Sequence, residues 1–313
     1  MAVVSFNEKE LLRACLASLA ADAETGQAEV WVVDNASTDG SAEMVAAEFP
    51  WVSLIASEEN VGYGAAVNLV AERTDADWIA PANQDVEVEP GTLERMLDAG
   101  RAHPDVATVA PRLVGPRGET QHSVHPFPTV WLMLLFNLGI PRLSRRLADR
   151  LCLEGYWDPN RAREVPWAIA AFLLVRRDAF ESVGSFDPDM WLHAEDLDLA
   201  WRLDRAGWTV WYEPDASVRH AGSVSTKKAF GSELEARFMA ASYAWMARRR
   251  GFAVARSVAL LNFSGAALRV LLLWPAARLL RRRSAIAGRD AQRRWARIHL
   301  AGLRPRRELT KRH

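Results

Sequence analysis

The chain has 313 residues, of which 50% are hydrophobic and 25% are charged, and it contains two cysteines. These proportions are typical of a globular protein with a sizeable core, and they exclude disordered, collagen-like and disulfide-stabilised chains. The 39 basic and 39 acidic side chains balance, but residues 248–313 hold 18 of the basic and only 2 of the acidic ones. An acidic body with a basic tail predicts two roles, and such a tail suits a polyanion, either nucleic acid or an anionic membrane surface.

The first 80 residues alternate between short apolar runs and helical periodicity. Apolar runs that are typical of buried strands occur at residues 2–6, 29–33, 52–55 and 78–80. Helical patterns occupy residues 8–19, 41–49 and 62–72, and Asn7 is a suitable N-cap for the first. This alternation predicts an α/β fold with a mostly parallel sheet.

Compact polar residues follow each of these predicted strands. They are Asn7, Asp34-Asn35, Glu59-Asn60 and Asn83-Gln84-Asp85. Ligands of open α/β sheets bind beyond the carboxyl ends of the strands, so we expect these residues to form one polar rim at a binding site. Asp34 is suited to accept a hydrogen bond from a base or ribose, although Asp, Asn, Ser and Gly are also ordinary turn residues. Asp85 is suited to a divalent metal that takes oxygen ligands and a diphosphate.

Two adjacent acids begin the helix predicted at residues 191–206. Glu195 and Asp196 would be stabilised there by the helix dipole alone, or one of them could act as a general base near a hydroxyl.

Gly62 allows a ligand to approach the start of a helix, but the third glycine of a dinucleotide-binding loop is absent, which argues against a Rossmann dehydrogenase. His220 follows a strand-like run, where a single histidine is more often structural than a ligand.

The C-terminal part is helical from residue 232. Residues 252–280 are apolar but contain Arg256 and Arg269, and the longest run without a charge has 12 residues, fewer than the ~20 that a spanning helix needs. We therefore expect an interfacial helix or hairpin whose arginines reach the lipid headgroups. The apolar stretch at residues 130–138 is also too short to span a bilayer.

Seven motifs carry a family resemblance when they are taken in order. They are VVSFN, VVDNASTDGS, the N-x-G-y-x-x-A-x-N pattern of residues 60–68, N-x-D at residues 83–85, AxxLVRRxAFExVGxFDPxxW, ED-x-D-L-x-x-R and a strand followed by His220. Together they resemble an inverting family 2 glycosyltransferase of the GT-A fold, close to the bacterial rhamnosyltransferase-like branch. The resemblance covers residues 3–225.

The resemblance implies a role for each site residue. Donor-binding residues would be Asn7, Asp34, Asn60, Gly62, Asn83 and Asp85. Asp85 and His220 would hold Mn²⁺ or Mg²⁺ on the donor diphosphate, and Asp196 would be the catalytic base, assisted by Glu195. The acceptor would contact Trp167, Trp191 and Asp198.

The implied reaction is the inverting transfer of a sugar, with rhamnosyl favoured, from a nucleoside-diphosphate sugar to a lipid-linked or polysaccharide acceptor in cell-envelope glycan synthesis. Residues 1–228 would form the catalytic domain. Residues 229–313 would form a basic helical region that holds the enzyme, as a peripheral protein, on the anionic cytoplasmic face of the cell membrane, with no nucleic acid expected.

Two alternatives remain open from the sequence. A non-catalytic nucleotide-sugar-binding or scaffold protein on the same fold is suggested by Asn83, which stands where the family has the first Asp of its DxD motif. A nucleic-acid-binding protein is suggested by the basic tail, but the acidic body would repel phosphates.

Overall fold

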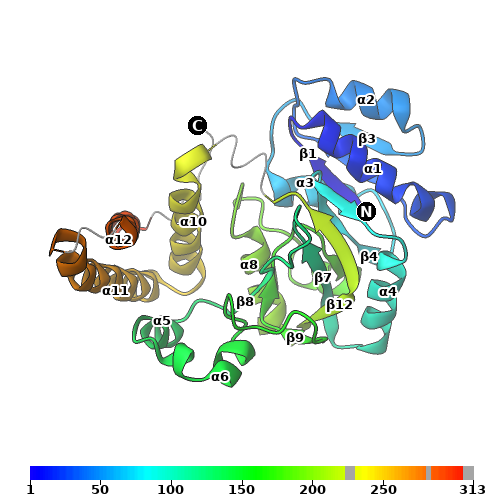
Figure 1. The fold of residues 1–313 in the computed structure, drawn as a ribbon. Helices are drawn as coiled ribbons and strands as arrows, with labels where there is room; N and C mark the ends of the chain where they lie inside the picture. Colours follow the sequence, from blue (N-terminus) through cyan, green and yellow to red (C-terminus); the bar gives the residue numbers. More distant parts are fainter. Residues whose placement is uncertain (223–229, 280–282, 306–313) are drawn as a thin grey trace. The chain divides into compact units, whose positions relative to one another are not determined.

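The computed structural model describes residues 1–222, 230–279 and 283–305. The chain divides into two compact units (Figure 1). The first contains Met1–Phe127 and Asp149–Gly231, and the second contains Pro128–Ala148 and Ser232–His313. The boundary expected between residues 228 and 229 lies outside the described residues. Residues 128–148, which the sequence analysis assigned to the catalytic domain, group here with the C-terminal helices.

A parallel four-stranded sheet begins the first unit. Its order is β3 (Ser53–Ala56), β2 (Trp31–Asp34), β1 (Ala2–Ser5) and β5 (Pro81–Asn83), and every neighbouring pair is parallel. The intervening helices are α1 (Lys9–Glu24), α2 (Ser41–Glu48) and α3 (Tyr63–Ala71). The predicted alternation of strand and helix is therefore confirmed.

The strand predicted at residues 78–80 forms only β4 (Trp78–Ile79), and a second short strand that the sequence analysis did not predict follows it in the other sheet. β4 pairs with β11 (Leu174–Arg176) in the second sheet, whereas β5 pairs with β1. Pro81, which has no N–H to donate, stands where the chain changes sheet. A hydrophobicity pattern cannot detect this change because the two strands are only two and three residues long and follow each other almost directly.

The second sheet is mixed and has the order β4-β11-β7-β12-β6, with one further strand paired to β12. Its remaining strands are β6 (Val86–Val88), β7 (Val106–Val114), β9 (Arg163–Val165) and β12 (Thr209–His220). The strand-like run before His220 belongs to the long strand β12, whose register against β7 shifts between Glu213 and Ser217. A small separate sheet pairs β8 (Val124–His125) with β10 (Trp167–Ala168).

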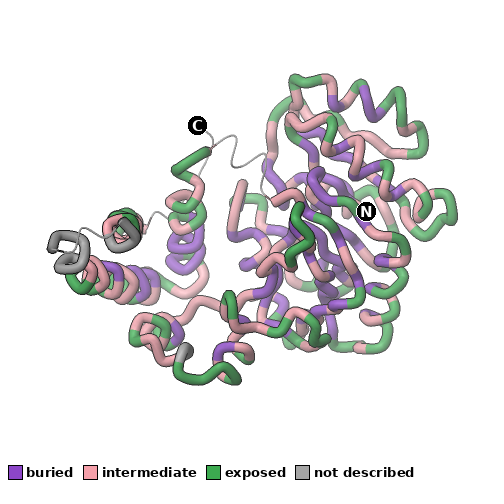
Figure 2. The backbone as a smooth tube through the Cα atoms, viewed as in Figure 1, coloured by how far each residue is buried: buried purple, intermediate pink, exposed green. Residues whose placement is uncertain are grey.

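The core of the first unit lies between the strands and the helices that cover them, where the buried residues gather (Figure 2). Leu12, Leu16 and Leu19 recur at helical spacing on α1, and all three are fully buried in this core. The helices α4 (Thr92–Ala102), α7 (Arg177–Ser182) and α8 (Glu195–Arg205) complete the first unit.

The second unit is built from helices. They are α5 (Val130–Asn137), the 3₁₀ turn η1 (Ile140–Leu143), α6 (Arg145–Arg150), which crosses the boundary between the units, α10 (Leu234–Arg249), α11 (Phe252–Leu279) and α12 (Arg283–Ala301). Within the described residues, α11 is one continuous helix, and its part Phe252–Leu273 is long and apolar enough to cross a membrane. Helices of this length and composition also occur in the cores of soluble proteins.

A buried ion pair anchors α8, the helix that begins with the two adjacent acids. Arg202 Nε donates to Asp198 Oδ2 over 2.7 Å, and its other nitrogens donate to the carbonyls of Val183 and Ser185 over 2.5 and 2.7 Å. The Asp198 side chain is fully buried. Because the guanidinium binds both α8 and the loop after α7, it fixes the position of the helix.

We predict that Arg202→Ala lowers the free energy of unfolding by about 3–5 kcal/mol, since it removes the cation that faces a buried carboxylate. Urea denaturation followed by circular dichroism measures the change. Arg205→Ala, on the exposed side of the same helix, should change stability by less than about 0.5 kcal/mol. Equal effects of the two substitutions would refute this role for Arg202.

Candidate functional site

The predicted polar rim is present at the carboxyl edge of the parallel sheet. Asn7 Oδ1 accepts the N–H of Thr38 over 2.8 Å, and Asn7 N–H donates to Ser37 Oγ over 3.0 Å. Asn7 therefore joins the loops after β1 and β2. It is not the N-cap of α1, because Glu8 holds that position and Asn7 has a left-handed φ of 47°.

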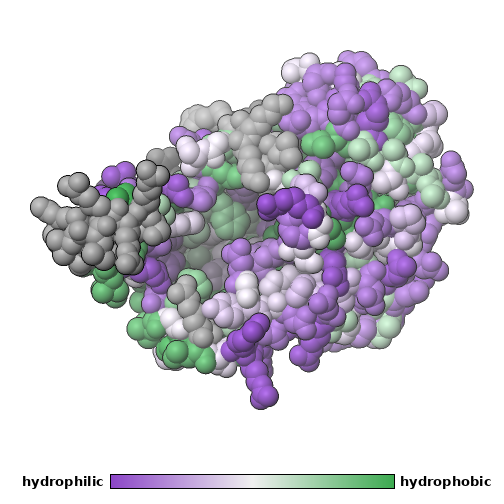
Figure 3. All heavy atoms as spheres, in the orientation of Figure 1, coloured by the Kyte–Doolittle hydropathy of each residue, from purple (hydrophilic) through white to green (hydrophobic). Residues whose placement is uncertain are grey.

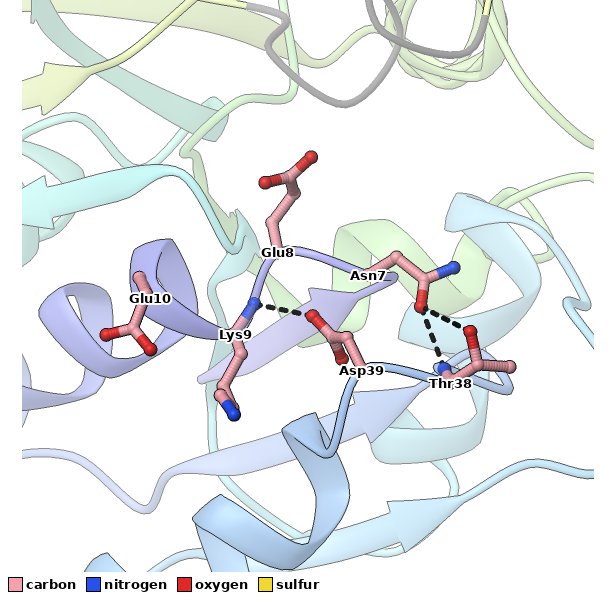
Figure 4. A pocket seen from close by; sticks show the side chains of 6 residues that line it. All are labelled: Asn7, Glu8, Lys9, Glu10, Thr38 and Asp39. Carbon is pink, nitrogen blue, oxygen red and sulfur yellow. Dashed lines mark hydrogen bonds between the residues drawn. The ribbon is translucent and has the colours of Figure 1, made fainter.

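A shallow hollow of about 470 Å³ lies beside these loops (Figure 4). It is lined by Asn7, Glu8, Lys9, Glu10, Thr38 and Asp39. Asn7 is its only predicted donor-binding residue, so the hollow by itself does not define the donor site.

Asp34 has one carboxylate oxygen engaged and one available. The residue is 3% exposed, its Oδ2 accepts the N–H of Ser37 over 2.9 Å, and its Oδ1 is buried without a hydrogen-bond partner among the described residues. A buried oxygen that is left without a donor costs free energy, so such an atom is suited to a ligand that brings a hydroxyl or an N–H.

The loop after β3 is held by two amide side chains. Asn35 Oδ1 accepts the N–H of Val61 over 3.3 Å, and Asn60 Oδ1 accepts the N–H of Gly62 over 3.0 Å. Trp191 Nε1 donates to the carbonyl of Asn60 over 3.1 Å. Gly62 has a φ of +90°, and a Cβ atom on it would collide with the carbonyl oxygen of Trp191. The glycine expected to make room for a ligand thus makes room for Trp191.

Gln84, one of the residues expected at the polar rim, connects the ends of β1 and β5. Its Oε1 accepts from Ser5 Oγ and from the N–H of Phe6, both over 2.8 Å. Its Nε2 donates to the carbonyl of Phe6 over 2.9 Å. These bonds fix the backbone between Asn83 and Asp85 relative to β1.

Asp85 and His220 lie together because β6 and β12 pair antiparallel, with His220 opposite Val86. His220 Nε2 is 3.5 Å from Asp85 Oδ1. This nitrogen is buried and makes no hydrogen bond within the described part of the chain, while Nδ1 lies 2.7 Å from Gln121 Oε1. A carboxylate beside an imidazole nitrogen of this kind fits a divalent metal. No group of three or more His, Cys, Asp or Glu side chains that could hold a metal occurs among the described residues.

Glu195 and Asp196 stand at the start of α8 in a backbone that is strained. His193 and Ala194 both have left-handed φ values, 69° and 66°, which non-glycine residues rarely adopt and which recur at functional sites. Asp196 Oδ2 accepts the N–H of Ala170 over 3.2 Å, and its Oδ1 accepts the N–H of Leu197 over 2.7 Å.

The two carboxyl groups differ in their electrostatics. Burial raises the pKa of Asp196, and hydrogen bonds from the backbone N–H groups of Leu197 and Ala170 partly oppose this rise. Burial raises the pKa of Glu195 further, and the negative charge of Asp196 adds to the effect. Glu195 Oε2 is buried without a hydrogen-bond partner among the described residues. Burial and mutual repulsion therefore disfavour a charge on both groups at once, and the backbone N–H groups that bond to Asp196 favour the charged form of that residue.

Tyr63 connects this pair to the rim, and the sequence analysis did not identify it. The Tyr63 hydroxyl donates to the carbonyl of Ala170 over 2.5 Å. The N–H of Ala170, in turn, donates to Asp196. Burial raises the pKa of Tyr63 well above its usual range, so the hydroxyl remains a donor. Its position as the first residue of α3, directly after Gly62, gave no signal in the sequence.

The three expected acceptor residues differ in accessibility. Trp191 is half-buried beside Asn60. Trp167 is 6% exposed, and its Nε1 donates to the carbonyl of Pro126 over 3.1 Å. Asp198 is fully buried against Arg202. Such burial argues against direct acceptor contacts for Trp167 and Asp198. In this structure both side chains contact neighbouring residues of the protein instead.

Comparisons with known proteins identify the family and the fold. The family model for glycosyl transferase family 2 matches residues 1–184. An N-acetylglucosaminyl-diphospho-decaprenol L-rhamnosyltransferase of Mycobacterium tuberculosis is 32% identical over 244 residues, covering 74% of this chain and 79% of the relative. The O-antigen chain rhamnosyltransferase WbaN of Salmonella anatum is 24% identical over 221 residues, covering 70% and 65%.

The fold is that of the GT-A glycosyltransferases. The mannosyltransferase PcManGT from Pyrobaculum calidifontis, solved in complex with GDP-Man and Mn²⁺, superposes with a TM-score of 0.59 at 17% identity. The match covers 96% of this chain and 85% of that one. At this identity the likeness concerns the fold alone.

We predict that Glu195→Gln makes the melting temperature less dependent on pH. Because the pKa of Glu195 is raised in the folded protein, its stabilising contribution is complete below the ordinary glutamate pKa of about 4.3 and is lost as pH rises through the raised value. The wild type should therefore lose more stability than the variant between about pH 5 and pH 9. Thermal denaturation over this range measures the difference, and the exposed substitution Glu94→Gln serves as control. Parallel curves for the wild type and Glu195→Gln would contradict the prediction.

Proposed function

Because the chain belongs to glycosyl transferase family 2, we propose that it transfers a rhamnosyl group, with inversion, from a nucleoside-diphosphate sugar to a lipid-linked acceptor in cell-envelope glycan synthesis. The sugar and the acceptor class are suggested by the names of the two rhamnosyltransferases that it resembles. One observation carries the proposal: Asp34 Oδ1, Glu195 Oε2 and His220 Nε2, all in residues expected at the site, are buried without hydrogen-bond partners among the described residues.

The donor would bind along the carboxyl edge of the parallel sheet. Asp34 Oδ1 would accept a hydrogen bond from the base or ribose, and Asn7 and Asn60 would hold the surrounding loops in place. Asn83 and Asp85 would lie near the diphosphate. The bonds from Gln84 to the end of β1 support this arrangement, because they leave the backbone at Asp85 little freedom.

Asp196 would be the base that activates the acceptor. Two backbone N–H groups hold its carboxylate, and such bonds favour its charged form. It would take the proton of the acceptor hydroxyl while that oxygen bonds to the anomeric carbon. The bond from that carbon to the diphosphate breaks on the opposite face, so the configuration inverts and the nucleoside diphosphate leaves.

Asp85 and His220 would hold a divalent metal, Mn²⁺ or Mg²⁺, and the adjacent carboxylate and imidazole nitrogen fit such an ion. When bound, the metal supplies Lewis-acid neutralisation of the charge on the departing diphosphate. With only two protein ligands, the remaining coordination positions would fall to diphosphate and water oxygens, as is usual for Mg²⁺ in phosphate-binding enzymes.

The second unit would dock on the cytoplasmic face of the cell membrane. Large apolar side chains are exposed on α5 and its continuation, with Trp131 67%, Leu138 64% and Leu143 85% exposed, and hydrophobic residues gather at the surface around α5 (Figure 3). The exposed Arg145 and Arg146 follow directly, and each arginine near an anionic surface contributes about 1 kcal/mol. Tryptophan is favoured at membrane interfaces.

An interfacial position for α11 agrees better with its surroundings than a spanning one. Leu260, Leu268, Leu271 and Leu272 of α11 are exposed. However, α12 packs along α11 and carries Arg289, Asp290, Arg293 and Arg294. A spanning α11 would bring these charges into hydrocarbon, at about 2.5–3.5 kcal/mol each on insertion scales.

We predict that Asp196→Asn lowers sugar transfer at least about 100-fold, since general-base catalysis contributes about 10²–10⁴. The assay offers dTDP-rhamnose and UDP-sugars to a polyprenyl-diphosphate-linked N-acetylglucosamine acceptor. Thermal shifts with dTDP, UDP and GDP, each with and without Mn²⁺, should be the same for the variant and the wild type. Asp204→Asn, exposed on the same helix, is the matched control and should keep full transfer.

Full activity of a folded Asp196→Asn variant would exclude this mechanism. Nucleotide binding by the wild type without turnover of any acceptor would favour a nucleotide-sugar-binding scaffold instead.

We predict that the triple substitution Trp131→Ser, Leu138→Ser and Leu143→Ser weakens membrane binding at least ten-fold. Burial of one large apolar side chain contributes about 1.5–3 kcal/mol, and 1.4 kcal/mol corresponds to a factor of ten. Flotation with phosphatidylglycerol-containing vesicles measures binding, with pure phosphatidylcholine vesicles as the neutral surface. Trp51→Ser, which removes an exposed tryptophan from the first unit, should have no effect. Unchanged flotation of the triple variant would show that this surface does not dock.

A further inference from the structure

We propose that Gln121 is a positioning residue that holds the His220 ring in the tautomer protonated on Nδ1, so that the lone pair of Nε2 faces Asp85. This inference rests on the proposed function, because it concerns the residues that would hold the metal. It adds a residue to the site that no motif of the sequence indicated.

A tight hairpin brings Gln121 to the end of β12. β7 ends at Val114, and the chain turns back through Gly118, which has a left-handed φ of +82°. Gln121 N–H then donates to the carbonyl of Leu113 over 2.8 Å. Since β12 pairs with β7 and places Arg219 opposite Val114, the returning chain lies beside His220.

The orientation of the Gln121 amide follows from its partners. One end of the amide is 2.8 Å from the carbonyl oxygen of His220, and the other end is 2.7 Å from His220 Nδ1. A backbone carbonyl only accepts hydrogen bonds, so the end that faces it must be the NH₂ group. The oxygen Oε1 therefore faces Nδ1, and an amide oxygen can only accept. Nδ1 must then carry the proton.

The neutral ring that results has its lone pair on Nε2, the nitrogen that lies 3.5 Å from Asp85 Oδ1. In the opposite tautomer, an Nε2–H would point toward the carboxylate and no lone pair would be available for a metal. Histidines that bind metals commonly donate their other N–H to a fixed acceptor, which sets both the tautomer and the ring orientation. Gln121 provides that acceptor here, and its second bond, to the His220 carbonyl, prevents the amide from rotating.

The tautomer can be measured directly by ¹⁵N NMR of the histidine side chains in the metal-free, full-length protein. At a pH where the ring is neutral, we expect the His220 signals to show protonated Nδ1 and unprotonated Nε2, with assignment by their loss in His220→Gln. In Gln121→Leu, which cannot accept a hydrogen bond, that tautomer preference should be lost. In Gln121→Glu, the carboxylate still accepts from Nδ1–H, so the tautomer should be kept.

Mn²⁺ titration gives the second readout. Loss of a residue that orients a metal ligand typically weakens metal binding by about 10–100-fold, and we expect this for Gln121→Leu. Gln27 is exposed and distant in sequence from Gln121. The control variant Gln27→Leu should therefore bind Mn²⁺ as the wild type does. Melting temperatures show whether each variant is folded, and Gln121→Glu tests the tautomer independently if Gln121→Leu fails to fold.

A wild-type His220 protonated on Nε2, or a Gln121→Leu variant with an unchanged tautomer, would overturn the inference. If instead the tautomer is as expected but His220→Gln binds Mn²⁺ as tightly as the wild type, the metal site of the proposed function fails. The assignment of Gln121 to the ring orientation would then stand without its metal role.

Discussion

The parallel pairing of β1 with both β2 and β5 is the constraint on which the site depends. Because these strands run in the same direction, their carboxyl ends meet at one edge, and the loops that follow them must pack against one another. Asn7 and Gln84 make the hydrogen bonds between neighbouring loops. These bonds connect the loops of the rim to one another without a ligand, and a site whose groups are already held in place loses less entropy when a ligand binds.

Burial decides the chemistry at the start of α8. In water, two adjacent carboxyl groups would both ionise near pH 4. Here burial raises the pKa of both, and Asp196 receives a hydrogen bond from a neighbouring segment, through the N–H of Ala170. The strained backbone at His193 and Ala194 presents the pair, and the bonds from Arg202 keep α8 in place behind it. Burial, backbone strain and the ion pair behind α8 thus together set the position and the pKa of the Glu195 and Asp196 carboxyl groups.

The second unit combines two separate parts of the sequence. Polar side chains connect its helices: Tyr243 bonds to His299, Asn262 donates to Tyr243, and Asn137 donates to Asn262. Gly265 lets α5 approach α11, since a Cβ atom there would collide with the side chain of Asn137. The buried face of α11 is formed by small apolar residues, Ala255, Ala259 and Ala266 among them, whereas Leu260, Leu268, Leu271 and Leu272 of the same helix are exposed and available for a lipid surface.

The sequence by itself determined the strand and helix alternation, the order of the sheet-edge residues and the family, because these depend on local periodicity and on motifs that are contiguous in the chain. It also predicted Asp34, Asp85, Glu195 and Asp196 as residues of the site. Only the tertiary structure decided which of them are buried, which oxygen of Asp34 is available, and that Trp167 and Asp198 are enclosed.

The tertiary structure also decided the division of residues 78–83 between two sheets, the grouping of residues 128–148 with the C-terminal helices, and the contacts of Tyr63 and Gln121. These features arise from contacts between residues that lie far apart in the chain, such as the 107 positions between Tyr63 and Ala170 or the 99 between Gln121 and His220. No local pattern encodes such a contact, because it exists only once the sheets have assembled and excluded water.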